Sequence, residues 1–179
     1  ADHIGVWGFS AGGHLASTVS TQYDSGDKDA KDPIDRVGCR PDFAILCYPV
    51  ISMIESPHAT SRTMLIGDHP SEELLRKTSS ELQVRPGLPP CFLWHTCEDK
   101  MVPVQHTQLY AAALQKNGIP HEPHLYEHDC RAVGDLAERP GSQGGIQGRA
   151  QRLIAVAHAH AVRLREAGHR HALVVEQHG

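Results

Sequence analysis

The stretch Ile4-Gly5-Val6-Trp7-Gly8-Phe9-Ser10-Ala11-Gly12-Gly13-His14-Leu15-Ala16 decides the fold. Residues 4–7 have the β-branched and aromatic composition of a strand. A helix is predicted after the glycine-rich turn, with one face formed by Ala11, Leu15, Val19 and Tyr23. The segment from Gly8 to Gly12 matches G-x-S-x-G, in which a sharp strand-to-helix turn presents a nucleophilic serine. The alternative is a glycine-rich turn that contains a serine by chance.

Strand and helix patterns alternate along the rest of the first 128 residues. Apolar runs predict buried strands at 43–48 and 91–96, and a further strand is expected at 121–127. Ser71 followed by two glutamates predicts a short helix to about Lys77, and a second helix should start near Pro103 and stop at Gly118. This order predicts an α/β fold with a parallel sheet of about four strands flanked by helices.

Composition divides the chain of 179 residues into two parts. Residues 1–128 hold all nine aromatic residues, and 129–179 form a tail rich in Ala, Arg, Gly and His that matches no pattern we can assign. Propensity favours one helix over 149–166 in that tail. We therefore expect one domain segment over 1–128 and an unassigned segment over 129–179.

Charge and cysteine content exclude several classes of protein. A net charge of −4 gives no support for binding to nucleic acid or to an anionic membrane surface, and no apolar run reaches the length of a transmembrane helix. The five cysteines are odd in number and include no C-x-x-C pair, so free thiols in a reducing, cytoplasmic compartment are expected.

Asp99 is the candidate partner acid because it follows the predicted strand 91–96 closely. The carboxyl ends of parallel strands meet at one edge of a sheet, where Ser10 should also lie. The alternative is an aspartate that caps the helix near Pro103, and Glu98 is the neighbour with which Asp99 could be confused.

Several motifs in the same order resemble the esterases and lipases of the α/β-hydrolase superfamily, nearest to acetyl-esterase and feruloyl-esterase-like families. The resemblance covers residues 1–128. It rests on 4–16, Tyr-Pro-Val at 48–50, Leu-Ile-Gly at 65–67, residues 89–96, and Asp99 with Val102-Pro103. It implies the C-terminal part of that fold, with the N-terminal half of the fold absent from this chain. It also implies a nucleophile, an acid and a histidine in that order.

The histidine departs from the family pattern. The best register places Arg131 where the histidine belongs, and arginine cannot act as a general base because it stays protonated. His128, three residues earlier, is the remaining candidate base. The predicted triad is therefore Ser10, Asp99 and His128, with the backbone N–H of Ala11 as an oxyanion donor.

These residues predict a serine carboxylesterase-type hydrolase of small or acetylated esters. The expected partner is a small-molecule ester, without nucleic acid or membrane, and no cofactor or metal is implied. An unpaired outer strand would also favour a homo-oligomer. Two alternatives stay open: a catalytically inactive α/β-hydrolase-like fragment or binding module, and a peptidase of the same fold.

Overall fold

The computed structural model describes residues 4–127, which form a parallel sheet with helices against one face. The strands are β1 (Gly5–Phe9), β2 (Phe43–Cys47), β3 (Cys91–Thr96) and β4 (His121–Tyr126), and they lie in that order across the sheet. The helices are α1 (Ser10–Thr21), α2 (Ala59–Ile66), α3 (Glu72–Thr78) and α4 (Gln105–Lys116), with a 3₁₀ turn η1 (Ser80–Gln83). The predicted four-stranded parallel sheet is confirmed.

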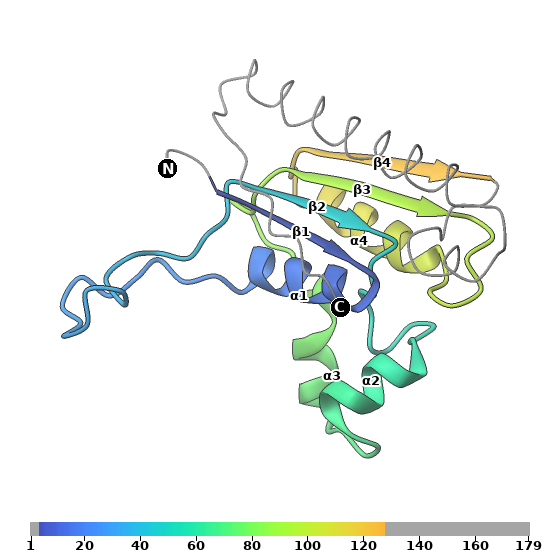
Figure 1. Cartoon of the computed structure of the whole chain (residues 1–179), viewed down its shortest axis with the longest axis horizontal. Helices are drawn as coiled ribbons and strands as arrows, with labels where there is room; N and C mark the ends of the chain where they lie inside the picture. Colours follow the sequence, from blue (N-terminus) through green and yellow to red (C-terminus); the bar gives the residue numbers. More distant parts are fainter. Residues whose placement is uncertain (1–3, 128–179) are drawn as a thin grey trace, which may run out of the picture.

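The two faces of the sheet are built from different side chains. Alternate residues of β2 point to opposite faces, so Ala44 and Leu46 face α1 and α4, whereas Phe43, Ile45 and Cys47 face the other way. Figure 1 shows α1 and α4 on the same side of the sheet. The aliphatic core lies between these two helices and the sheet, which fixes the direction in which each strand end points.

The opposite face carries a row of aromatic rings that crosses the sheet. Ring centroids are 5.9 Å apart for Phe9 and Tyr48, 5.5 Å for Tyr48 and Trp94, and 6.1 Å for Trp94 and Tyr126. Each of these ring pairs joins two neighbouring strands, with Tyr48 lying just after the end of β2. These ring contacts add to the backbone ladder that holds neighbouring strands together.

Helix α1 does not bury the face that the spacing predicts. Leu15 is 58% exposed, and the buried residues are small or polar, among them Gly13, Ala16 and Ser17. Small residues let α1 approach its neighbours closely, so that Ser17 Oγ lies 2.7 Å from Ser80 Oγ of η1. The prediction was wrong because it counted apolar residues, whereas close approach selects for small side chains.

Helices α3 and α4 match their predicted boundaries more closely. Ser71 accepts a hydrogen bond from the Leu74 N–H at the start of α3, and Gly118 has a φ of 66° after the end of α4. The loop between α1 and β2 is largely exposed and extends away from the sheet (Figure 1). Within residues 4–127, no helix is long and apolar enough to cross a membrane.

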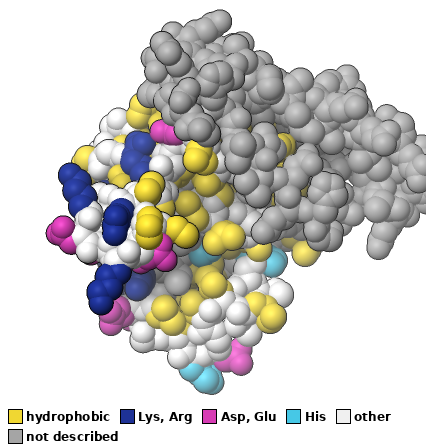
Figure 2. All heavy atoms as spheres, turned by 60° about the vertical axis from the view of Figure 1, so that its left-hand side comes forward, with side chains coloured by type: hydrophobic (Ala, Val, Ile, Leu, Met, Phe, Trp, Pro, Cys, Tyr) yellow, Lys and Arg dark blue, Asp and Glu magenta, His cyan; other side chains and the backbone are white. Residues whose placement is uncertain are grey.

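Lys and Arg side chains mix with Asp and Glu on the face drawn in Figure 2. They lie beside yellow apolar side chains rather than in one block of a single sign. The predicted tail helix at 149–166, Cys130 and Arg131 lie outside the described residues.

Candidate active site

Ser10 stands at the turn from β1 into α1 with a strained backbone. Its φ is 50°, in the left-handed region that non-glycine residues rarely adopt. The Val50 N–H donates to the Ser10 carbonyl oxygen over 3.0 Å, so the segment after β2 supports the turn. Strain of this kind at a half-buried serine between strand and helix is the geometry in which G-x-S-x-G presents a nucleophile.

Two glycines permit the sharp turn for steric reasons. A Cβ on Gly8 would lie 2.2 Å from the Gly12 carbonyl oxygen, and a Cβ on Gly13 would lie 2.7 Å from Cβ of Pro49. Both distances are far below van der Waals contact. Gly12 itself would place a Cβ in open space, so close packing against the described residues does not require glycine there.

The backbone N–H of Ala11 lies in the first turn of α1, where N–H groups have no carbonyl of the preceding turn to bind. The partial positive charge of the helix N-terminus adds to the donor strength of this N–H. Ala11 is exposed. Its N–H can therefore donate to an oxyanion that forms on a substrate carbonyl next to Ser10.

Asp99 is held rigidly in the turn after β3. Its Oδ1 accepts hydrogen bonds from the N–H groups of Met101 at 2.8 Å and Val102 at 3.0 Å. These donors belong to the turn and not to α4, which begins at Gln105. Asp99 is 9% exposed, whereas its neighbour Glu98 is exposed, so burial separates the two candidate acids.

His95 packs beside this carboxylate but has its own structural partners. Its Nε2 lies 3.6 Å from Asp99 Oδ2 and donates to the Val102 carbonyl oxygen at 2.9 Å, while its Nδ1 lies 2.7 Å from Thr107 Oγ1. The imidazole is fully buried. Its hydrogen bond to Val102 stabilises the turn that contains Asp99, and neither ring nitrogen is exposed to contact a substrate.

Ser10 and Asp99 lie at the same edge of the sheet. In the strand register, Phe9 pairs with Cys47 and Cys47 with Trp94, so the last residue of β1 lies level with Trp94, close to the end of β3, on the other side of β2. Two strand spacings separate them by about 10 Å. An imidazole that hydrogen bonds to both side chains can bridge a gap of that size.

The predicted base His128 lies outside the described residues. The last described strand before it, β4, ends at Tyr126 beside β3, where the Cys97 N–H donates to the Tyr126 carbonyl oxygen over 2.8 Å. The chain thus leaves β4 at the edge that carries Ser10 and Asp99. The structure brings two of the three predicted side chains to one edge, and His128 as base stays a prediction.

A groove of about 390 Å³ adjoins the β1–α1 turn that contains Ser10 and was not predicted from the sequence. It lies between α1 and α2 and is mostly apolar; its lining residues are Ala11, His14, Met53, Thr60, Ser61, Met64 and Leu65. The sequence shows no periodic pattern at 59–66, and α2 buries no residue, which is why this helix was missed. The cap at His58, which accepts from the Ser61 N–H, is the one local signal for it.

His14 has a structural role in the wall of this groove. Its Nε2 donates to the Thr78 carbonyl oxygen at 2.7 Å, and burial lowers the pKa of its imidazole. His14 ties α1 to the end of α3.

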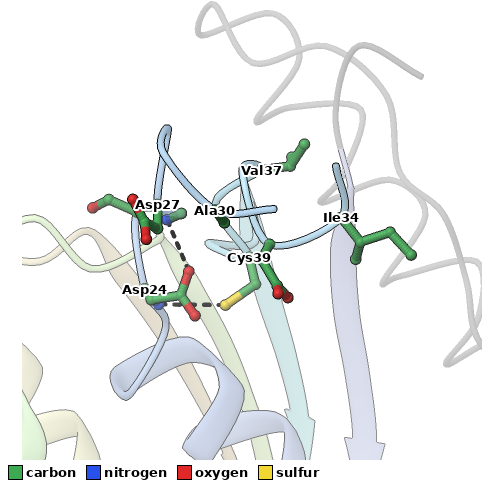
Figure 3. Close-up of a pocket in the computed structure, with 9 residues that line it drawn as sticks. Asp24, Asp27, Ala30, Ile34, Val37 and Cys39 are labelled. Carbon is green, nitrogen blue, oxygen red and sulfur yellow. Dashed lines mark hydrogen bonds between the residues drawn. The ribbon is translucent and has the colours of Figure 1, made fainter. Parts of the chain in front are cut away.

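A second cavity, of about 610 Å³, lies in the loop between α1 and β2, at the opposite end of the strands from Ser10 (Figures 1 and 3). Its carboxylates make local turns; Asp24, for example, accepts from the Gly26 N–H over 2.8 Å. Within residues 4–127, no group of three or more His, Cys, Asp and Glu side chains is arranged to hold a metal ion.

Comparisons with known proteins place this geometry in a family. The chain is 41% identical over 115 residues to an endo-1,4-beta-xylanase B of Butyrivibrio fibrisolvens, covering 64% of this chain and 18% of that protein. It is 35% identical over 120 residues to an acetylxylan esterase of Xylanibacter ruminicola, covering 64% of this chain and 22% of that protein.

Among solved structures, an acetyl ester-xyloside bifunctional hydrolase of Caldicellulosiruptor lactoaceticus is 43% identical with a TM-score of 0.71, covering 86% of this chain and 56% of that one. The chain thus spans about half of this relative and about a fifth of the two others. Its sheet is accordingly part of an α/β-hydrolase fold. The profile of the BD-FAE family matches residues 1–114, and the chain belongs to that family.

Proposed function

We propose that the site is that of a serine carboxylesterase-type hydrolase that acts on small or acetylated esters. The observation that carries the proposal is the strained Ser10 at the β1–α1 turn, at the same edge as the buried Asp99. Relatives named as an acetylxylan esterase and an acetyl ester-xyloside hydrolase support acetyl esters as the substrate class. The groove beside Ala11 offers apolar surface for part of such an ester.

In the proposed reaction, Ser10 Oγ attacks the ester carbonyl carbon while the base, His128, accepts the hydroxyl proton. The oxyanion accepts a hydrogen bond from the Ala11 N–H, and Asp99 holds the imidazole in the tautomer that can take up the proton. The imidazolium then protonates the leaving alcohol. Water, deprotonated by the same imidazole, attacks the acyl-serine and releases the acid.

The test is labelling of the full chain with a fluorophosphonate probe, followed by peptide mapping. Ser10 is expected to carry the label. Ser10→Ala should abolish labelling, and Asp99→Asn should slow it by about 10⁴-fold. Ser25→Ala, in the exposed loop, and Glu98→Gln, one residue from Asp99, are matched controls that should label like the original chain.

His128 is tested in the same assay because Arg131 occupies the position that the family register gives to the histidine. His128→Gln should reduce labelling as strongly as Asp99→Asn, and Arg131→Gln should not. A soluble, folded chain that is not labelled would overturn the proposal in favour of a binding module. Hydrolysis of aminoacyl anilides in preference to p-nitrophenyl acetate would favour the peptidase alternative.

A further inference from the structure

His106 is a buried histidine in the first turn of α4 that binds a distant segment through both ring nitrogens. It is 0% exposed. Its Nδ1 accepts hydrogen bonds from the N–H groups of Ile51 at 2.8 Å and Ser52 at 3.1 Å. Its Nε2 lies 2.9 Å from the Ser56 carbonyl oxygen.

These three partners determine the state of the ring. Two backbone N–H groups can only donate, so Nδ1 must present a lone pair, and a carbonyl oxygen can only accept, so Nε2 must carry the proton. The neutral Nε2–H tautomer alone satisfies all three contacts. Protonation would place an N–H bond at Nδ1 against two other N–H groups and would break the contacts with Ile51 and Ser52.

The partners of His106 lie in residues 50–56, which we call the post-β2 segment. This segment begins with Val50, whose N–H supports the Ser10 carbonyl, and it includes Met53 in the wall of the groove. Tyr48, just before it, and Ser56, at its end, have φ values of 36° and 47°. A segment bounded by two strained residues keeps its shape only when outside contacts hold it.

We propose that His106 is a positioning residue: its neutral imidazole fixes the post-β2 segment and thereby holds the nucleophile turn and the groove wall in place. As far as Ser10 reactivity is concerned, this inference rests on the proposed function. The contact chain runs from the His106 ring to Ile51, along one peptide to Val50, and from Val50 to Ser10.

The surroundings of His106 keep it neutral. Burial lowers the pKa of its imidazole, and the hydrogen bond to Ser56 opposes that shift. The titratable groups around it are His14 from α1, His58 from the loop before α2 and His95 from β3, and each would disfavour a charge on His106. Glu81 of η1 reaches the neighbouring Ser52, and burial raises the pKa of this carboxyl.

The test combines spectroscopy on the full chain with two variants. Long-range ¹H–¹⁵N spectra should show Nε2 of His106 protonated and Nδ1 unprotonated at pH 7.5. His106→Leu removes the acceptor and should raise amide exchange of Ile51, Ser52 and Val50 by about tenfold or more. His106→Asn keeps an acceptor near the position of Nδ1 and should bring these rates back to within about threefold of the original.

The rate of fluorophosphonate labelling of Ser10 tests the effect of His106 on the reactive serine. His106→Leu should slow fluorophosphonate labelling about tenfold or more, His106→Asn should restore most of the rate, and His121→Asn, at the start of β4, is a control without effect. Below neutral pH, the labelling rate of the original chain should fall relative to that of His106→Asn by up to about the factor seen in His106→Leu, because protonated His106 loses the same contacts with Ile51 and Ser52. The His106→Asn variant should not show this additional decline, because asparagine has no imidazole to protonate at this position.

Three results would overturn the inference: a protonated Nδ1, unchanged Val50 exchange in a folded His106→Leu variant, or the same acid decline in His106→Asn as in the original chain. If His106→Leu does not fold, the inference is tested by the observed tautomer of His106 and by the acid decline of the His106→Asn variant. If the original chain is not labelled at pH 8, that result refutes the proposed function and not the contacts of His106. The amide-exchange measurements test the contact of His106 with the post-β2 segment independently, since they need no reaction at Ser10.

Discussion

The glycines of the β1–α1 turn differ in what the structure requires of them. A methyl group on Gly8 would meet the Gly12 carbonyl oxygen at 2.2 Å, its carbon at 2.5 Å and the Gly13 nitrogen at 2.8 Å. All three atoms are backbone and cannot rotate away as a side chain could. The first turn of α1 would have to move by about 1 Å to reach ordinary contact, and overpacking of this kind costs about 1–3 kcal/mol.

Gly12 is the matched comparison because the same methyl group would enter open space there. Gly12 lies in α1 on an exposed turn, where alanine is favoured over glycine by about 0.5–1 kcal/mol. Gly8→Ala and Gly12→Ala should therefore differ in free energy of unfolding by about 1.5–4 kcal/mol, with opposite signs relative to the original chain.

Urea denaturation followed by the fluorescence of Trp7 and Trp94 measures this difference, since both side chains pack against the sheet. Labelling of Ser10 should change in parallel: a shift of about 1 Å in its turn is expected to slow the reaction about 10²-fold in Gly8→Ala. Equal midpoints for the two variants, or a destabilised Gly12→Ala, would show that the close approach of β1 and α1 does not govern this turn.

Three further predictions follow from strain and burial. Ser10→Gly should be more stable to urea than Ser10→Ala by about 1 kcal/mol, because glycine accepts the positive φ freely; a more stable alanine variant would argue against strain. Burial raises the pKa of Cys47 to about 12 and also raises that of Cys91. Both thiols should therefore resist disulfide reagents at pH 8 until the chain unfolds, whereas the exposed thiol of Cys39 should react at once. Mass mapping of the modified cysteines measures the difference. Burial also raises the pKa of Glu81, so the folded chain binds its proton more tightly than the unfolded chain; the stability this proton contributes is full below the unfolded pKa and is lost as pH rises through the folded pKa. Glu81→Gln should accordingly stabilise the chain at pH 8 but not at pH 4, and an equal gain at both pH values in urea titrations would contradict this.

The sheet, and the position of Ser10 and Asp99 at its edge, could be predicted because the relevant signals are local. The apolar runs at 43–47 and 91–96 form buried strands, since a parallel strand covered on both faces must be apolar throughout. Ser10 and Asp99 follow such strands closely in the sequence, so the sheet geometry brings them to one edge.

The features that were missed depend on contacts between distant residues or on loosely packed elements. His106 lies 55 residues from Ile51, and nothing in the sequence between them indicates their contact. Helix α2 buries none of its side chains and therefore leaves no periodic pattern. In α1 the buried face was misassigned, because Leu15 follows the apolar spacing but points to solvent.

The row of rings across the sheet has an optical consequence. Tyr48 lies between Phe9 and Trp94, and Trp94 lies between Tyr48 and Tyr126, at centroid distances of 5.5 to 6.1 Å. Chromophores this close couple their electronic transitions, so the near-ultraviolet circular dichroism of the chain is a property of the whole row. A single spectrum thus registers whether β1, β2, β3 and β4 are aligned side by side, without any added label.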